Sequence, residues 1–569
     1  MSFPKIGVGA AERGPLAAVV VVGSVAGAGL WGRAPWWAGA VTVCVVVVTL
    51  TVRVGGRTGV RWLIDWCSYR LDRQARAQAR GSLAVLRDVE VAAGLCGVRD
   101  DDSVYVAMIQ LAPNLDLPTV IAERELYTED TVPVQELLHM LDQFGIDIGI
   151  DIVTTGQRVR PAGGYSMLYD QLIGAHPVVG DRMTWLVLRL DPQRNLLALG
   201  QRGPIAESGP KALASAAHRI AGRLRERGME AQPLPADALR DAIRLLHSGV
   251  ELTDLRETWH RLESSVPSRG VTSYLIDWSR LDGAGLDDCW SWNRGRTTVV
   301  ISLAGGALGA RGLVRYVGPA AAVAPPGYLR PLGGHQSDAL RAGLATATSV
   351  HRLPVATDSA GDTATPEQLA GLAIAIGPSG QILGSISGRP KHTLALPLFD
   401  PARYNPRHRS IDVYADLPVA QQIVLRAMVV GADVEVHSSR PQRWQQLVAE
   451  VGDPDSLRMA PDAADIGSDS ASDGVQATIA VFDQVPPRVS AAHTTVTISD
   501  PGAPRRRSAD LAIDQVGASA IDVSIPMRTV RVDLIEPRGE TRYLDAPGNV
   551  PASGVPAGAV EAESNKAGR

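Results

Sequence analysis

Two long uncharged segments near the N-terminus constrain this chain more than any other feature. The segments "PLAAVVVVGSVAGAGLW" (15–31) and "APWWAGAVTVCVVVVTLTV" (34–52) each approach the ~20 residues that a helix needs to cross a bilayer. A very short loop separates them, and tryptophans flank it as expected at a membrane interface, namely Trp31, Trp36 and Trp37. We therefore predict a transmembrane helical hairpin within residues 1–56.

Two other structures could use the same segments. A signal peptide would take Lys5 and Arg13 as its basic region and "AGA" (38–40) as its cleavage site. A pair of helices buried in a soluble core would also be apolar throughout. The signal peptide is disfavoured because a second apolar segment follows the first at once, which is typical of a membrane hairpin.

Arginines concentrate directly after the second apolar segment. Residues 53–80 contain seven arginines against Asp65 and Asp72, whereas the whole chain has a net charge of −4. By the positive-inside rule, this side of the membrane is cytoplasmic, and the remaining chain is predicted to face the cytosol.

The basic segment itself, residues 57–83, has aromatic and basic residues at helical spacing. We predict a juxtamembrane helix that contacts anionic lipid or a partner protein, or that is simply a solvated topology signal. The candidate contact residues in it are Arg57, Arg61, Trp62, Trp66 and Arg73.

Residues 84–323 are predicted to form a first cytosolic α/β region. Period-2 alternation indicates strands at 102–112, 146–155 and 183–191, and helical spacing indicates helices at 132–145 and 209–228. This β–α–β–β–α order, with an edge strand after it, permits a ferredoxin-like half-sheet.

A second cytosolic α/β region, Rossmann-like, is predicted for residues 335–545. The turn-rich segment "APPGYLRPLGG" (324–334) separates it from the first region. The tail 546–569 is rich in Ala, Gly and Pro and is predicted to be disordered. The fold class is thus α/β (α+β), with two N-terminal transmembrane helices before the cytosolic units.

The stretch "SIDVYADLPVAQQIVLRAMVVGADVEVHSSRPQRW" (410–444) has the outline of a βαβ unit that holds a nucleotide. Asp416 is a suitable N-cap, Pro418 lies in the first helical turn, and Gly431 ends the helix. A dinucleotide site, however, needs glycines at the first turn so that backbone N–H groups can approach the pyrophosphate. The turn "YADLPVA" has none, so we expect no cofactor. Arg440 and Trp444 are instead predicted to serve capping, packing or partner contact.

No other motif predicts a catalytic, metal or nucleic-acid site. The four cysteines form no CxxC pair, and the eleven histidines form no HExxH motif. Glycine-rich segments such as 302–312 lack the Walker lysine. We therefore predict no metal, no cofactor and no enzymatic activity, and basic runs in the acidic part of the chain are too short to favour nucleic acid.

Two segments resemble the EccE family, a core membrane component of the mycobacterial type VII (ESX) secretion system. They are "TWLVLRLDPQRNLLALGQRG" (184–203) and "IVLRAMVVGADVEVHSSRPQRW" (423–444). The resemblance implies a structural subunit of a large hetero-oligomer in the plasma membrane, with EccB, EccC and EccD components as partners. Two alternatives remain open, a membrane-anchored enzyme such as a sugar-nucleotide transferase and a nucleotide-sensing regulator.

Overall fold

The computed structural model describes residues 6–8, 52–54, 57–71 and 84–544, with side chains from Asp65 onward. Short gaps interrupt the last range at 102–103, 123–124, 162, 282–284, 293–294, 306–308, 322, 355–360, 461–475, 507 and 527. The predicted span 15–31, all of 34–52 except Val52, and the predicted tail 546–569 lie outside this set. Of the helices that the structure describes, none has the length and apolarity required to cross a bilayer.

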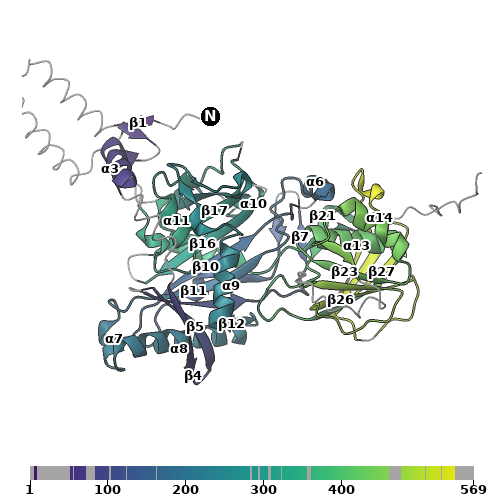
Figure 1. The fold of residues 1–569 in the computed structure, drawn as a ribbon, viewed down its shortest axis with the longest axis horizontal. Helices are drawn as coiled ribbons and strands as arrows, with labels where there is room; N and C mark the ends of the chain where they lie inside the picture. The colour runs from purple at the N-terminus through teal and green to yellow at the C-terminus, as the bar shows by residue number, and fades with distance from the viewer. Residues whose placement is uncertain are drawn as a thin grey trace, which may run out of the picture.

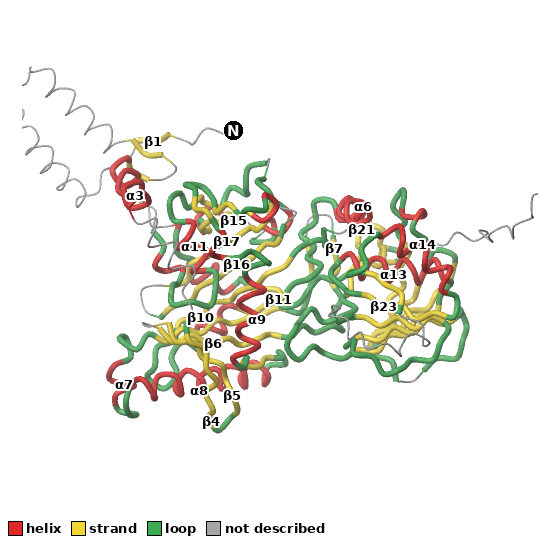
Figure 2. The backbone as a smooth tube through the Cα atoms, viewed as in Figure 1, coloured by secondary structure: helices red, strands yellow, loops and turns green. Residues whose placement is uncertain are grey.

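The described residues form a mixed α/β structure built on two large sheets (Figures 1 and 2). The first sheet is antiparallel throughout, and with its helices we call it the first unit. Its strands, in spatial order, are β13 (Arg256–Glu257), β14 (Leu262–Glu263), β15 (Gly270–Ile276), β17 (Gly309–Gly318), β16 (Arg296–Ala304), β10 (Gly149–Gly156), β11 (Met183–Leu190), β6 (Val104–Leu111), β5 (Gly94–Asp101) and β4 (Val85–Val91). Two short strands pair off this path, β12 (Ala231–Pro233) on β6 and β18 (Leu329–Pro331) on β15.

Part of the first sheet has the ferredoxin-like order that the sequence permits. Along the chain, β6, the helix α5 (Val134–Leu138), β10, β11, the helix α8 (Ile205–Glu226) and β12 follow one another. In space the four strands lie in the order β12-β6-β11-β10, all antiparallel. β12 pairs with the C-terminal half of β6, while β5 pairs with its N-terminal half.

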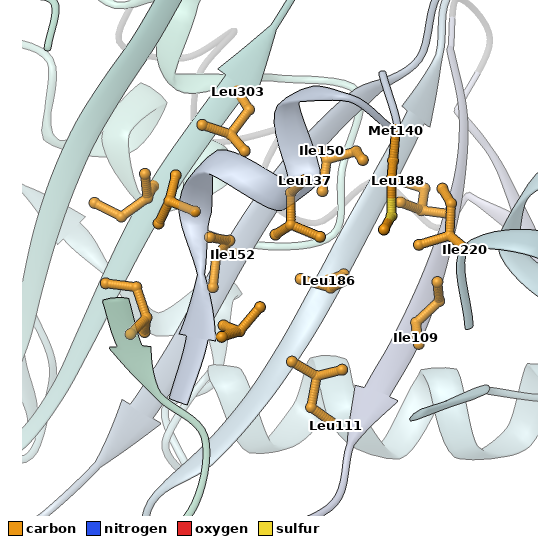
Figure 3. Packing of buried hydrophobic residues seen from close by; sticks show 14 of the residues in the cluster. Ile109, Leu111, Leu137, Met140, Ile150, Ile152, Leu186, Leu188, Ile220 and Leu303 are labelled. Atoms are coloured by element: carbon orange, nitrogen blue, oxygen red, sulfur yellow. The ribbon is translucent and has the colours of Figure 1, made fainter. Parts of the chain in front are cut away.

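Alternating side chains of these strands build two separate cores. One face buries Ile109, Leu186 and Ile152 against α5 and α8, and Figure 3 shows this packing around Leu137 and Ile220. The opposite face buries their neighbours along each strand beneath α9 (Ala236–Leu246) and α11 (Gln336–Ala342). Each buried Leu or Ile contributes roughly 1.5–3 kcal/mol. Because β6 and β11 carry apolar side chains on both faces, helices cover both sides of the sheet.

The helix predicted at 132–145 is wrong in length, because α5 ends at Leu138. Gln143 and Ile146 exchange backbone hydrogen bonds of 2.9 and 3.3 Å around Phe144 and Gly145. Both central residues have positive φ, 58° and 78°. Two successive left-handed residues form a type I′ turn, which a right-handed helix cannot contain.

The second sheet, with its helices, forms the second unit. Its parallel part is β24 (Leu457–Met459), β23 (Val434–Ser438), β25 (Ile479–Asp483), β26 (Thr494–Ser499), β22 (Arg409–Tyr414) and β27 (Leu511–Gly517). The antiparallel part continues through β28 (Ala520–Ile525), β29 (Arg528–Leu534), β20 (Gln381–Ile386), β21 (Arg389–Leu396), β7 (Thr119–Ile121) and β8 (Leu126–Tyr127).

The predicted βαβ elements exist, but their strands are not neighbours. β22, α13 (Leu417–Val429) and β23 follow one another as expected, yet β26 and β25 lie between the two strands. The next connection, through α14 (Pro441–Val451), continues in the same direction to β24. Since such crossovers are right-handed, both helices lie on one face of the sheet, whereas a doubly wound dinucleotide fold has helices on both faces.

The chain passes repeatedly between the two units. β7 leaves the first unit to pair with β21, and β8 pairs with β7. β9 (Thr131–Pro133) pairs with β19 (Ala373–Ala375), which follows the short helix α12 (Pro366–Ala370). The helix α6 (Gly163–Ile173) comes from the first half of the chain but packs against α13 and α14. The predicted boundary at 324–334 therefore does not describe a simple division of the chain into two successive halves.

Candidate functional site

The carboxyl edge of the parallel strands is where a nucleotide would bind in a related α/β fold. At the start of α13, Leu417 is buried and Pro418 removes a backbone donor. Asp416 occupies the predicted N-cap position, but its side chain makes no capping hydrogen bond. Instead its carboxylate accepts from the Gln515 amide at 3.2 Å, and its N–H donates to the Gln515 oxygen at 2.7 Å. The position that a phosphate would need is occupied by the chain's own acid and amide.

Arg440 follows β23, at the position where an NADP enzyme would hold a 2′-phosphate. Here it is bound to an internal carboxylate. Its Nε and Nη2 donate to the two oxygens of Asp483 at 2.9 and 2.7 Å. Asp483, the last residue of β25, is fully buried and also accepts from Ser438 at 2.6 Å and from the Trp444 indole at 2.8 Å. We call these four residues the Asp483 cluster.

The electrostatics of the Asp483 cluster favour a fixed ion pair. Burial alone would raise the pKa of Asp483, but the hydrogen bonds from Arg440, Ser438 and Trp444 outweigh it, so the pKa is lowered. The carboxylate thus stays ionised and holds the guanidinium. The Trp444 side chain is fully buried within the second unit. A pyrophosphate or 2′-phosphate would have to compete with Asp483 for Arg440.

We predict that Arg440→Ala destabilises the second unit by about 2 kcal/mol, because it leaves the buried carboxylate without its cation. Denaturant unfolding of the full chain in detergent measures this loss. Arg389→Ala, at an exposed arginine of the same unit, is the matched control and should change stability little. Dinucleotide binding that is present in the wild type and lost in Arg440→Ala would contradict the interpretation.

The helix α3 (Gly59–Leu71) lies within the range 57–83, for which the sequence predicts a juxtamembrane helix. One side of it docks on the first unit. The Tyr69 ring meets Trp259 edge to face at 5.5 Å and its hydroxyl donates to the Glu257 carbonyl at 3.1 Å, while Asp65 lies 3.5 Å from His335.

The other side of α3 faces outward. Trp66 is 38% exposed, and the Arg70 guanidinium lies 5.3 Å from its ring centroid. Leu71 is largely exposed as well. The remaining predicted contact residues cannot be placed, since Arg73 and the side chains of Arg57, Arg61 and Trp62 lie outside the described part. The outward side presents the amphipathic pattern of an interfacial helix.

A cleft of about 930 Å³ lies where the two units meet. Several of its charged groups pair with one another, as Arg227 does with Glu136 and Arg407 with Asp116. Burial raises the pKa of Asp130 to about 6, although N–H groups of Asn114 and Gly377 act in the opposite direction. Within the described ranges, no group of three or more His, Cys, Asp or Glu side chains could hold a metal ion. The cleft therefore presents a mixed polar surface.

Comparison with known proteins identifies relatives of one kind. Residues 178–276, which include β11, α8 and α9, match the family model described as "Putative type VII ESX secretion system translocon, EccE". The chain is 25% identical over 474 residues to the ESX-2 secretion system protein EccE2 of Mycobacterium tuberculosis, covering 79% of this chain and 82% of that protein.

Two further relatives match over shorter stretches. The ESX-1 secretion system protein EccE1 of M. tuberculosis is 31% identical over 198 residues, 34% of this chain and 43% of that protein. The ESX-5 secretion system protein EccE5 of Mycobacterium marinum is 27% identical over 271 residues, 45% of this chain and 65% of that protein. Each relative is named as a secretion-system protein, and the resemblance predicted from residues 184–203 and 423–444 is confirmed.

Proposed function

We propose that this chain, which belongs to the EccE family, is a structural and non-catalytic subunit of the membrane complex of a type VII (ESX) secretion system. The observation that carries the proposal is the similarity to EccE2 over 79% of the chain. Residues 1–56 anchor the subunit in the plasma membrane as a hairpin, and the two units face the cytosol. The partners are EccB, EccC and EccD components, and an EccC-type ATPase supplies the energy.

The carboxyl edge of the second unit supports the non-catalytic part of this proposal. Its arginine is committed to Asp483, and its first helix begins with a buried leucine and a proline rather than glycines. In this fold the chain's own side chains fill the position where a ligand would bind. Such a fold is suited to forming contact surfaces for other subunits. The outward side of α3, with Trp66 and Arg70, lies against anionic lipid beside the hairpin.

We expect the tagged full chain to co-purify with the other ESX membrane components after extraction in a mild detergent. Size-exclusion chromatography followed by mass spectrometry measures this, with an unrelated hairpin membrane protein at matched expression as control. Recovery only as a free monomer would contradict the proposal. A thermal shift with nucleotide sugars and Mg²⁺ would instead favour the transferase-like or nucleotide-sensing alternatives.

A further inference from the structure

Two loops at one end of the first unit expose large apolar side chains. Phe144 is 74% exposed, and Leu196 and Leu197, at the start of the short helix α7 (Leu196–Gly200), are 52% and 86% exposed. Asn195 joins the loops, since its side chain accepts from the Asp147 N–H at 2.8 Å and donates to the Asp147 carbonyl at 3.0 Å. The apolar groups are thus held on one rigid double loop.

The conformation of Phe144 is unfavourable for the residue it contains. Its φ of 58° is left-handed, at the first central position of the type I′ turn, where asparagine or glycine is strongly preferred. A bulky residue with positive φ is an outlier that persists where surrounding structure or function maintains it. Among the described residues, the Phe144 ring belongs to no hydrophobic core that would offset the cost of its positive φ. A favourable contact with another molecule would offset this cost.

Arginines surround the exposed ring. The Arg219 guanidinium lies 5.0 Å from the Phe144 ring centroid, and Arg202 donates to the Phe144 carbonyl at 3.1 Å. Burial, together with the neighbouring charges of Arg202 and Arg223, lowers the pKa of Arg219. Within the part of the chain that the structure describes, these three arginines form no salt bridge. Uncompensated cations beside exposed apolar groups favour an acidic partner with apolar side chains.

Among the described residues, the acids of the same loops form no ion pair with these three arginines, and each has another partner. Asp147 pairs with Arg194 at 2.5 Å, Asp142 accepts the Gly145 N–H at 2.8 Å, and Asp191 accepts the Gln193 N–H at 2.9 Å. We define the tip surface as the apolar and basic residues together, namely Phe144, Leu196, Leu197, Arg202, Arg219 and Arg223.

The position of the tip surface argues against lipid as its occupant. Figure 1 places α7 and the docked helix α3 at opposite ends of the first unit. If α3 lies at the membrane, the tip surface points away from it. We propose that the tip surface docks an acidic segment with apolar side chains that belongs to another subunit of the secretion complex. This inference rests on the proposed function and adds to it the contact surface and the chemistry of the partner.

Site-specific photocrosslinking in the assembled complex tests the proposal. A benzophenone amino acid is placed at Leu197, and in a separate chain at Val489, which is fully exposed in the second unit. We expect an adduct from position 197, but not from 489, with an acidic segment of one other subunit of the purified complex. An adduct with lipid or with a second copy of this chain, or no adduct within an intact complex, would overturn the proposal.

Two substitutions separate docking from folding. In the chain with the crosslinker at 197, Phe144→Asn should reduce the adduct at least fivefold while leaving Tm unchanged or raising it by about 2 °C, because asparagine suits the left-handed turn. Arg223→Glu should reduce the adduct severalfold, whereas Arg389→Glu should not. An unchanged adduct in both tip variants would contradict docking here. If the wild-type chain does not co-purify at all, the proposed function fails, and that result is distinct from co-purification without the adduct.

Discussion

Glu540→Gln is expected to destabilise the second unit by about 3–5 kcal/mol, the cost of leaving a buried charge without its partner. Arg426 and Glu540 are 1% and 0% exposed, and their Nη2 and Oε2 atoms lie 3.0 Å apart. Burial would lower the pKa of Arg426, but Tyr165 and Glu540 carry it above its ordinary value. Because an arginine side chain does not lose its proton in proteins, the guanidinium remains charged when Glu540 is replaced.

Glutamine cannot reproduce the hydrogen bonds of Glu540. One oxygen accepts from Gln422 and Arg426, and the other accepts from Tyr165 and from Arg426 Nε. A glutamine has a single acceptor oxygen, so its NH₂ group would face donors on the other side. The consequence is an unsatisfied buried network rather than a conservative replacement.

Denaturant unfolding of the full chain in detergent measures the loss, and hydrogen exchange locates it. Amides of α13 and of residues 535–544 should lose protection first, because Arg426 also donates to the Ile535 carbonyl. Asp522→Asn is the matched control, since it breaks an exposed pair with Arg531 on neighbouring strands of the same sheet and should change stability little. A loss no greater than that of the control would refute the interpretation.

The hydrogen bonds of Glu540 also show which features of this unit cannot be predicted from the sequence. The pattern of 410–444 predicts α13 between Asp416 and Gly431, and the structure agrees to within two residues. The same pattern assigns one apolar face to the helix. In the structure Gln421, Gln422 and Arg426 are buried too, because α6 and the C-terminal segment cover the second side. Both covering segments lie more than a hundred residues from α13 in the sequence. Their contacts therefore leave no periodic pattern in residues 410–444.

The order of the strands in the sheets cannot be predicted from the sequence for the same reason. Period-2 alternation locates β10 and β11, but nothing local places β26 and β25 between β22 and β23, or carries β7 to β21. Pairing depends on contacts between distant segments, which a single sequence does not display. The candidate site, too, could be predicted only in part from the sequence. The lack of glycines at 414–420 can be seen in the sequence, whereas the Asp483 partner of Arg440 and the turn at Phe144 required coordinates.

Asp151→Asn is expected to destabilise the first unit by about 3–5 kcal/mol, again by leaving a buried guanidinium unpaired. Asp151 on β10 and Arg189 on β11 are diagonal neighbours, since Asp151 lies opposite Val187, and their side chains are 2% and 7% exposed. The second oxygen of Asp151 accepts from Ser302 at 2.6 Å. The substitution removes the anion at the centre of the sheet while the cation remains.

The same arginine holds a segment beyond the predicted boundary at 324–334. Arg189 donates to the carbonyls of Leu344 and Thr346 at 2.9 and 2.8 Å. Arg311 likewise donates to the carbonyls of Val350, His351 and Leu353. These contacts attach residues 344–353 to the first sheet although they follow the turn-rich segment.

Hydrogen exchange in the Asp151→Asn chain therefore tests both the ion pair and the boundary. Residues 344–353 should lose protection together with β10 and β11, while the parallel strands of the second unit keep theirs. Asp237→Asn, which breaks an exposed pair with Arg240 on α9, is the control and should alter neither. If 344–353 exchanged with the second unit instead, these contacts would not govern the segment. If they exchange with β10, the first unit extends at least to Leu353, and the turn-rich segment at 324–334, which contains β18, lies within it.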